Sequence, residues 1–487
     1  MFVTNIVRPT SGKYTMTSTL APPSQAGALS PARRWAVLAV ILAAEVLDLI
    51  DATITNLAAP SITASLKGGP SLVQWLGASY ALALGVLLVV GGRLGDKYGR
   101  RRVFLTGLAG FTAASVACGL AVGPQTLIAA RLVQGAFGAL LIPQGFGILG
   151  AVFPRDQTGK AFSAFGPVLG LSAVGGPILA ATLIDTDPLG LGWRSVFLIN
   201  IVLGGAALLA AHRLLPRDTG ERGTVIDAPG ALLLAGAMAT LLYGLIDGPA
   251  HDWRAVSWAA LGAAAVFFAL LARRQATAPH PLIQPSLFRN RGFVCGLVLG
   301  VAFFAAVAGL LYVVSLFLQG GLGYSPLRTA LTGSTPMAAG IVIASIACYR
   351  LIGRLGRTLV LIGLLTTLAG TAGLWAAVHT SGTATGPAAI IAATLVTGLG
   401  MGTCFGTVYD ITLGDVTPAE AGSGAGSLTA VQQLANALGA AAVTTVYLHT
   451  PGPAHAMTRS LLVVAGITLG CCCLVRLLPR TAQPQHH

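Results

Sequence analysis

The sequence predicts an all-α membrane protein with fourteen transmembrane helices. Its 487 residues are 54% hydrophobic and only 9% charged, and the mean hydropathy is +0.79. A soluble globular chain carries about 25% charged residues, because charged side chains cover its water-facing surface. The low charge content therefore excludes a soluble fold, and the 63 glycines suit helices that pack closely within a membrane.

The apolar stretches define the predicted helices. A bilayer core about 30 Å thick needs about 20 apolar residues in each spanning helix. Glycine, proline and charged residues mark where one stretch ends and the next begins. In chain order, the predicted spans are 35–58, 72–91, 103–122, 125–152, 161–184, 195–211, 229–247, 255–271, 293–318, 329–349, 359–378, 387–413, 425–447 and 458–478.

The basic residues predict the orientation of these spans. Cytoplasmic loops of membrane proteins carry an excess of Lys and Arg. With both termini in the cytoplasm, most of the 29 Lys and Arg residues fall on the cytoplasmic side. We therefore expect a multi-pass protein of the cytoplasmic membrane, and this bias explains the net charge of +14 without a nucleic-acid partner. A count of twelve spans gives the same alternation of cytoplasmic and outer loops, so it remains an alternative to fourteen. The basic residues expected outside are Lys67, Arg194, Arg254, Arg328 and Arg459.

The domain organisation follows from two short spans in the middle of the chain. The spans 229–247 and 255–271 lie between polar stretches and separate two blocks of six helices. The residues before the first span are rich in Ser, Thr and Pro, and we expect them to be disordered. The predicted units are a cytoplasmic tail (1–34), a six-helix bundle (35–211), a central two-helix insertion with flanking cytoplasmic loops (212–292), a second six-helix bundle (293–478) and a C-terminal tail (479–487).

Three carboxylates lie within the first predicted helix, at Glu45, Asp48 and Asp51. An ionised residue at the centre of a spanning helix costs about 2.5–3.5 kcal/mol on insertion scales. At 100° per residue the three fall within an arc of about 120°, so they share one face. That face must meet a water-filled cavity or polar partners, where burial and mutual repulsion favour protonated carboxyls.

Arg131 in the fourth predicted helix lies at a depth similar to that of Asp51. We expect the two side chains to be neighbours, joined directly or through a water. Because arginine does not lose its proton, Arg131 would favour ionised Asp51 when it is close and release this preference when the helices part. The alternative is a purely structural contact between helices, worth about 0.6–2 kcal/mol.

The loop before the third helix combines charge with glycine. Residues 92–101 read GRLGDKYGRR, and orientation in the membrane does not require its glycines or Asp96. This pattern resembles the loop signature of the major facilitator superfamily. The resemblance implies a conformational latch that braces two bundles on the cytoplasmic side, and a loop that only sets topology remains the alternative. The residues of this expected latch are Gly92, Asp96, Gly99, Arg100 and Arg101.

Further motifs resemble the fourteen-helix drug:proton antiporter branch of that family. The resemblance implies a major facilitator fold, in which two six-helix bundles are related by a pseudo-two-fold axis and a central helix pair is added. It departs from the family at Ala180-Ala181, and at 350–357, which lacks the aspartate. The matching motifs are 49–56, Gln74-Trp75 with Tyr80, Arg131 to Gly135, Gly170 to Pro177, Trp193 to Asn200, and Gly323 to Pro326.

The glycine-proline motif of the fifth helix implies, by this resemblance, a gasket against proton leak; simple close packing is the alternative. Other polar or aromatic residues in the spans are candidates to line a substrate cavity. The motif residues are Gly170, Gly175, Gly176 and Pro177, and the cavity candidates are Gln74, Trp75, Tyr80, Gln134, Gln144, Tyr312, Gln319, Gln433 and Asn436.

The predicted function is a proton-coupled exporter, an antiporter of amphipathic small molecules such as drugs or antibiotics that works by alternating access. The chain has no GxxxxGK[ST] motif for ATP, and its eight histidines form no HExxH-type site, so we expect no enzyme, no metal and no cofactor beyond protons. The expected partners are the lipid bilayer and a substrate that is cationic or amphipathic, and the expected state is a monomer. The alternatives are a dedicated exporter of one endogenous metabolite or antibiotic, and an exporter of lipid-like substrates.

Overall fold

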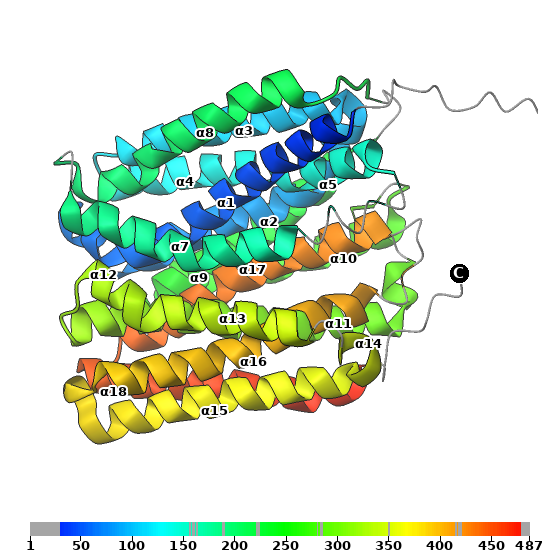
Figure 1. Cartoon of the computed structure of the whole chain (residues 1–487). Coiled ribbons are helices and arrows are strands. Elements are labelled where there is room, and N and C mark those ends of the chain that lie inside the picture. Colours follow the sequence, from blue (N-terminus) through cyan, green and yellow to red (C-terminus); the bar gives the residue numbers. More distant parts are fainter. Residues whose placement is uncertain are drawn as a thin grey trace, which may run out of the picture.

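The computed structural model is all-helical throughout the residues it describes, and its long helices run side by side (Figure 1). The predicted C-terminal tail and most of the predicted N-terminal tail lie outside these residues. The described residues are 30–154, 157, 161, 164–187, 190–220, 225–279, 281–282, 286–348, 351–413, 416 and 421–478.

The first half of the chain contains the helices up to Leu214. Ser30 caps the first of them by accepting a hydrogen bond from the Arg33 N–H, and a proline occupies the first turn, where no N–H is needed. Gly99, at φ +93°, makes the sharp reversal between the second and third. The helices are α1 (Pro31–Ser65), α2 (Pro70–Tyr98), α3 (Arg100–Gly119), α4 (Pro124–Gly138), α5 (Leu141–Val152), α7 (Phe165–Thr186) and α8 (Ser195–Leu214), with a 3₁₀ turn, η1 (Gly192–Arg194), before the last.

Two central helices follow, α9 (Ala228–Ala250) and α10 (Ala255–Thr277). Asp227 caps α9 and also accepts a hydrogen bond from Arg274 Nε at 2.7 Å, which ties the start of α9 to the end of α10. Helix α9 packs against α2 and α17, whereas α10 packs against α9. The pair therefore forms an antiparallel hairpin on one side of the two bundles.

The second half forms the other bundle. Two of its turns are π-helical, η3 (Phe317–Gly321) and η4 (Ala330–Ser334), and such turns are frequent at functional sites. Its helices are α11 (Arg291–Leu316), α12 (Pro326–Thr329), α13 (Thr335–Cys348), α14 (Ile352–Leu355), α15 (Arg357–Ser381), α16 (Pro387–Leu413), α17 (Ala421–Leu448) and α18 (Pro453–Leu474), with 3₁₀ turns η2 (Leu287–Arg289), η6 (Gly382–Ala384) and η7 (Val475–Leu477).

Every predicted span coincides with a described helical segment. The fourth span is divided into α4 and α5, and the tenth into α12, η4 and α13. Eleven segments of the described chain are long and apolar enough to cross a membrane. Helix α1 is not among them, because its three carboxylates and the basic pair at its start lower its hydropathy. The total of fourteen spans therefore stays a prediction.

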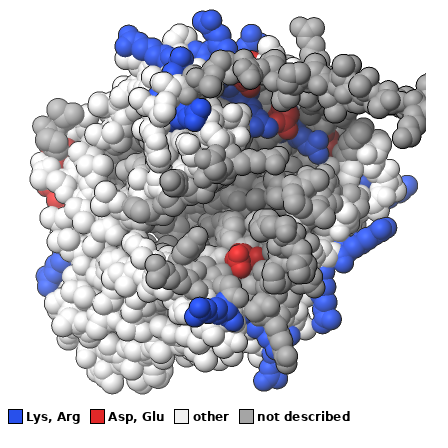
Figure 2. Space-filling model, turned by 45° about the vertical axis from the view of Figure 1, so that its right-hand side comes forward, with Lys and Arg blue, Asp and Glu red and all other residues white. Residues whose placement is uncertain are grey.

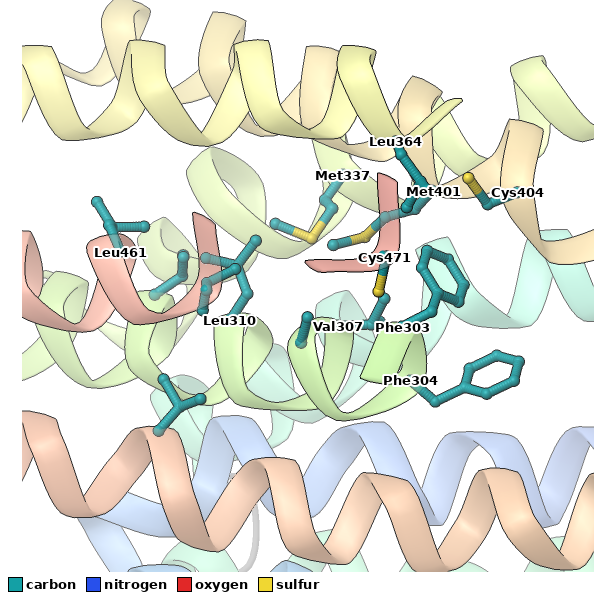
Figure 3. Close-up of a cluster of buried hydrophobic side chains, with 14 of the residues drawn as sticks. Phe303, Phe304, Val307, Leu310, Met337, Leu364, Met401, Cys404, Leu461 and Cys471 are labelled. Carbon is teal, nitrogen blue, oxygen red and sulfur yellow. The ribbon is translucent and has the colours of Figure 1, made fainter. Parts of the chain in front are cut away.

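The second bundle has an apolar core of aliphatic, aromatic and sulfur-containing side chains (Figure 3). Lipid tails are as apolar as leucine, so close packing rather than escape from water holds such helices together. A Cβ added at Gly340 would lie 2.7 Å from the Leu399 backbone nitrogen, which shows how closely α13 and α16 approach. The core includes Phe303, Phe304, Val307, Leu310, Met337, Leu364, Met401, Cys404, Leu461 and Cys471.

The two bundles touch at one end of the molecule. We call the end at which α1 begins and α18 ends the terminal end, on the right in Figure 1. At the opposite end, Gln319 Nε2 donates to the Leu57 carbonyl at 3.0 Å, and Gln74 Nε2 donates to Thr445 Oγ1 at 2.7 Å. The Leu327 N–H donates to Asp185 Oδ2 at 3.0 Å. These contacts join α1, α2 and α7 of the first half to the second half.

One face of α11 becomes exposed toward the terminal end. Ser315 of α11 is buried where it donates to the Asn56 carbonyl of α1, at 3.3 Å. About four turns further along the same face of α11, Val301 is 40% exposed. Figure 2 turns this end partly toward the reader and shows Lys and Arg around it. The hydrogen bonds between the bundles thus gather at the end opposite the terminal end, whereas α7 and α13 stay in contact further along, where a Cβ at Gly170 would lie 2.7 Å from Val342.

Candidate functional site

Asp51 of α1 and Arg131 of α4 form an ion pair in the interior of the first half. The exposed fractions of their side chains are 0% and 1%. Arg131 Nη1 donates to Asp51 Oδ2, so the two expected neighbours are in direct contact. Moving two charges out of water costs several kcal/mol per ion, and their attraction offsets this only when further hydrogen bonds satisfy both groups.

Those further hydrogen bonds come from α3, α4 and α8. Gln134 Nε2 donates to Asp51 Oδ1 at 2.8 Å, and Asn200 Nδ2 donates to the same oxygen at 3.0 Å. Both amides also donate to Ser115 Oγ, at 2.6 and 3.0 Å. Asp51 thus lies in a closed polar network in which Arg131, Gln134 and Asn200 donate to its carboxylate, and Ser115 accepts from the two amides.

Arg131 is held from three sides. Its Nη1 also donates to Gln134 Oε1 at 2.7 Å, and its Nε donates to the Leu76 carbonyl of α2 at 3.4 Å. The guanidinium lies over the Tyr80 ring, with Cζ 4.3 Å from the ring centroid, and near Phe197 at 5.8 Å. A cation over an aromatic face is attracted by the ring quadrupole, most strongly where water is excluded.

The other two carboxylates of α1 lie toward the terminal end and are progressively less buried. Asp48 is 8% exposed and accepts a hydrogen bond from the Tyr80 hydroxyl, whereas Glu45 is half-buried. Glycines on the facing helices leave room for both. A Cβ at Gly138 would lie 3.2 Å from Asp48 Oδ1, and one at Gly145 would lie 3.6 Å from Glu45 Oε1.

The three carboxyl groups of α1 form a series of increasing burial, and transfer of a proton along it stays a prediction. The three carboxyl groups lead from the half-buried Glu45, through Asp48, to the fully buried Asp51. A fixed cation stands only at the inner end of the series, because Arg131 pairs with Asp51. A proton on Asp51 removes the attraction between the pair, and helix packing can respond to that loss.

The expected latch residues lie at the terminal end of α2 and α3. Arg100 pairs with Asp96 at 3.1 Å and donates to the Gly147 carbonyl of α5 at 2.7 Å. Arg101 Nη2 donates to the His212 carbonyl of α8 at 2.6 Å. Sequence reasoning missed Asp218, whose carboxylate accepts from the backbone N–H groups of Arg100 and Arg101.

All of these latch contacts lie within the first half, where they fix the loop to α5 and to the segment after α8. A Cβ at Gly92 would be 3.6 Å from Pro143 of α5, and one at Gly99 would be 3.1 Å from the Asp218 carbonyl. The geometry therefore ties the loop to its own bundle in this conformation. A bracing contact with the other bundle stays a prediction.

The glycine-proline motif lies on α7, between α1 and α13. A Cβ added at Gly176 would be 2.9 Å from Thr53 Oγ1 of α1, and one at Gly170 would be 2.7 Å from Val342 of α13. Gly175 has nothing within 4 Å of an added Cβ, and Pro177 is buried within the helix. The motif thus permits close contact with both halves of the molecule, and its role as a gasket stays a prediction.

Several cavity candidates are buried between helices instead of facing the space between the bundles. Gln134 belongs to the Asp51 network, and Gln144 Nε2 donates to the Gly91 carbonyl at 2.7 Å. Gln74 and Gln319 join the two halves at the end opposite the terminal end. Tyr312 is also buried there, beside Gly77 of α2.

The remaining cavity candidates lie on α2 and α17. Tyr80 links Asp48 to Arg131, as described above, and Trp75 is half-buried. Asn436 Nδ2 donates to Gln433 Oε1 at 3.0 Å, and both side chains are half-buried. Their contact with a substrate stays a prediction.

Sequence reasoning missed an aromatic cluster in the second half. Phe303, Phe304 and Phe405 lie with their ring centroids 5.2–5.5 Å apart, and Tyr409 lies 6.3 Å from Phe304. The Tyr409 hydroxyl donates to Gln432 of α17. Phe405 and Tyr409 are half-buried and follow one another by one turn of α16. The spacing of Phe405 and Tyr409 in the sequence could have indicated an aromatic face on α16. Only the fold shows that α11 supplies the other two rings.

An apolar groove of about 820 Å³ lies elsewhere, on the side of the first half formed by α3, α4 and α8. Leu105, Phe137 and Leu208 are among its lining residues, and none of the network around Asp51 lines it. In the described part of the chain, no group of His, Cys, Asp and Glu side chains is arranged to hold a metal ion.

Comparison with known proteins agrees with this architecture. The family model described as Major Facilitator Superfamily matches residues 41–440. The chain is 43% identical to the "Probable actinorhodin transporter" of Streptomyces coelicolor, over 85% of this chain and 73% of that protein. It is 35% identical to "Puromycin resistance protein pur8" of Streptomyces alboniger, over 85% of this chain and 82% of that protein. A crystal structure of the peptide transporter POT in complex with sulfate has the same fold, with a TM-score of 0.67 at 16% identity, over 91% of this chain and 95% of that one.

Proposed function

The chain belongs to the Major Facilitator Superfamily, and from that premise we propose that it is a proton-coupled exporter of amphipathic small molecules such as drugs or antibiotics. It is a multi-pass membrane transporter, and its relatives include a transporter of an antibiotic and an antibiotic resistance protein. The proposal adds the coupling ion, the direction and the mechanism.

The buried pair of Asp51 and Arg131 carries this proposal. An ionisable residue inside a membrane protein is costly and marks an ion pathway or a proton relay. Asp51 is the only carboxyl of α1 that is both fully buried and paired with a fixed cation. It is therefore the group at which gain or loss of a proton changes the packing of α1 against α4 most directly.

The excess of Lys and Arg at the terminal end supports a cytoplasmic position for that end. On this proposal the conformation is the inward-facing one, in which the substrate enters between the bundles while Asp51 is paired with Arg131. After the bundles rock to the outward-open state, a proton taken up by Asp51 frees Arg131 as the substrate leaves. On return, the proton passes through Asp48 and Glu45 to the cytoplasm.

The half-buried rings of Phe405 and Tyr409 support a place for the substrate on the second half. An aromatic ring offers a large apolar surface with a preferred stacking geometry, and Tyr409 and Gln432 add polar atoms. The substrate would bind between this surface and the carboxylate-bearing face of α1.

The Asp51→Asn variant tests the coupling. We expect purified variant protein in liposomes to lose transport driven by a pH difference while it still exchanges internal for external substrate. Asp410→Asn is the matched control, because Asp410 is an exposed acid near the end of α16. Proton-driven transport at the wild-type rate in Asp51→Asn would refute the proposal.

A dedicated exporter of one antibiotic is the second candidate. It is favoured by the names of the two relatives above, each of which refers to a single compound. Growth of a pump-deficient host across a panel of unrelated toxic compounds separates the candidates. Protection against one scaffold supports a dedicated exporter, and protection against many supports a multidrug exporter.

A further inference from the structure

When Asp51 is ionised, both of its carboxylate oxygens accept hydrogen bonds. Its Oδ2 accepts from Arg131, and its Oδ1 accepts from the amides of Gln134 and Asn200. A protonated Asp51 needs the reverse, because its new O–H must find an acceptor. In a buried site, an unpaired O–H destabilises the state that contains it, because the group has lost its hydrogen bonds to water. The network must therefore change when the proton arrives.

One acceptor in this network is uncommitted. Asn200 Oδ1 is buried and has no hydrogen-bond partner. Gln134 Oε1, by contrast, already accepts from Arg131 Nη1 at 2.7 Å and lies 3.5 Å from the Cys118 thiol. Among the two amides that contact Asp51, only that of Asn200 has a free oxygen.

We propose that Asn200 is a positioning residue that serves both protonation states of Asp51 by rotating its side-chain amide. In the ionised state its Nδ2 donates to Asp51 Oδ1, as observed. A half-turn of the amide exchanges Nδ2 and Oδ1, so the oxygen then accepts the O–H of protonated Asp51. The proton added to Asp51 Oδ1 is the only atom gained. This inference rests on the proposed proton coupling and assigns Asn200 a role within it.

Ser115 allows the amide to turn without loss of its second partner. In the observed state Ser115 Oγ accepts from Asn200 Nδ2 at 3.0 Å. A serine hydroxyl both donates and accepts, and its hydrogen rotates freely. After the half-turn, Ser115 donates to Asn200 Oδ1. In the observed state the unpaired atom of the amide is Oδ1, and after the half-turn it is Nδ2. The number of unpaired amide atoms is therefore the same in both states.

The groups around Asp51 leave this role to Asn200. Arg131 is a donor without an acceptor, and Tyr80 donates to Asp48. Asp48 and Glu45 lie on the same helix toward the terminal end, and Cys118 faces Gln134 from α3. None of these charged and titratable groups on α1, α2, α3 and α4 thus offers Asp51 a free acceptor, and α8 supplies Asn200.

Difference infrared spectroscopy of the purified protein in lipid, with pH as the sole variable, tests the inference. Acidification of the wild type should produce the C=O band of a protonated carboxyl that is absent in Asp51→Asn. In samples with isotope-labelled asparagine, one amide C=O band should move to lower frequency at the same pH. That shift should vanish in both Asn200→Leu and Asp51→Asn.

The variants separate a positioning role from a structural one. In Asn200→Leu, the Asp51 carboxyl band should move to higher frequency, because its O–H has lost the acceptor. Asn200→Ser, which supplies a hydroxyl oxygen as an acceptor, should shift it less. Thr444→Val removes a buried hydroxyl that also lacks a partner and should leave the spectra unchanged.

An Asp51 band at the same frequency in Asn200→Leu and the wild type would overturn the role of Asn200 and leave the proposed function standing. A wild type in which no band depends on Asp51 at any pH would overturn both. The Asn200→Ser variant gives the same decision if Asn200→Leu does not reach the membrane.

Discussion

The two bundles share one architecture and differ in what they bury. The first half encloses an ion pair with amide and hydroxyl partners, whereas the core of the second half is made of aliphatic, aromatic and sulfur-containing side chains. In the described helices of the second half, charged residues lie only near helix ends, as Arg291, Arg357 and Asp410 do. The cost of burying charge is thus confined to one bundle.

This difference indicates a division of labour. A proton site needs groups that change charge in a closed polar network, and the first half has one around Asp51. A site for apolar rings needs a surface of constant polarity, and the second half offers one at Phe405 and Tyr409. Substitutions in the two bundles should therefore have separable effects on coupling and on substrate affinity.

The largest effect is expected from Arg131→Leu, which leaves Asp51 without its cation. Removal of one partner of a buried ion pair costs about 3–5 kcal/mol. The exposed Arg328 of the second half lies over the Tyr324 ring, with Cζ 4.0 Å from the centroid, and Arg328→Leu should cost at most about 1 kcal/mol.

Thermal unfolding of the two arginine variants in detergent measures this contrast. We expect Arg131→Leu to unfold at a clearly lower temperature than the wild type, and Arg328→Leu to unfold close to it. The double variant Asp51→Asn/Arg131→Leu should recover part of the loss, because no unpaired charge remains. Equal stability of the two single variants would contradict the comparison.

An intermediate effect is expected at the seam between α7 and α1. Gly176→Val adds bulk where even a Cβ alone would lie 2.9 Å from Thr53 Oγ1. Overpacking of this kind costs about 1–3 kcal/mol and forces the helices apart. We expect proton leak across liposomes in the absence of substrate, measured with an internal pH dye. Gly175→Ala is the matched control, since its Cβ meets open space, and leak in both variants or in neither would count against the gasket.

The smallest effect is expected from Phe405→Ala. An aromatic pair contributes about 0.5–1.5 kcal/mol beyond the area it buries, which corresponds to a rise in KM of about 2- to 12-fold. The number of protons exchanged per substrate should not change. Phe268→Ala on the outer helix α10 serves as control. A changed proton ratio in Phe405→Ala would break the division between the bundles.

The helices and the central ion pair were predictable from sequence because the bilayer fixes the length of a spanning helix and makes an unpaired buried charge costly. Apolar runs of fixed length mark spans, and opposite charges at one depth must find each other, as Asp51 and Arg131 do. The division between α4 and α5 was not predicted. Pro143 has no N–H to donate to the Ala139 carbonyl, so the helix breaks there, but one proline does not by itself distinguish a break from a bend.

The partners of the ion pair were harder to predict. Gln134 was expected in the cavity, and it instead completes the Asp51 network, because sequence does not show which face of α4 meets which neighbour. Asn200 and Ser115 lie far from Asp51 in sequence and adjacent to each other in space. Asp218 belonged to a polar stretch, and only the fold brings it to the N-terminus of α3.

The position of the α9–α10 hairpin makes the two flanks at which the bundles meet unequal. Helix α9 covers the seam at which α2 meets α17, whereas the seam between α7 and α13 has no such cover among the described helices. Among the described helices, only the flank at α7 and α13 therefore meets the bilayer without a covering hairpin. At this flank the glycines of α7 set how closely the two bundles approach, because a Cβ at Gly170 would lie 2.7 Å from Val342 of α13.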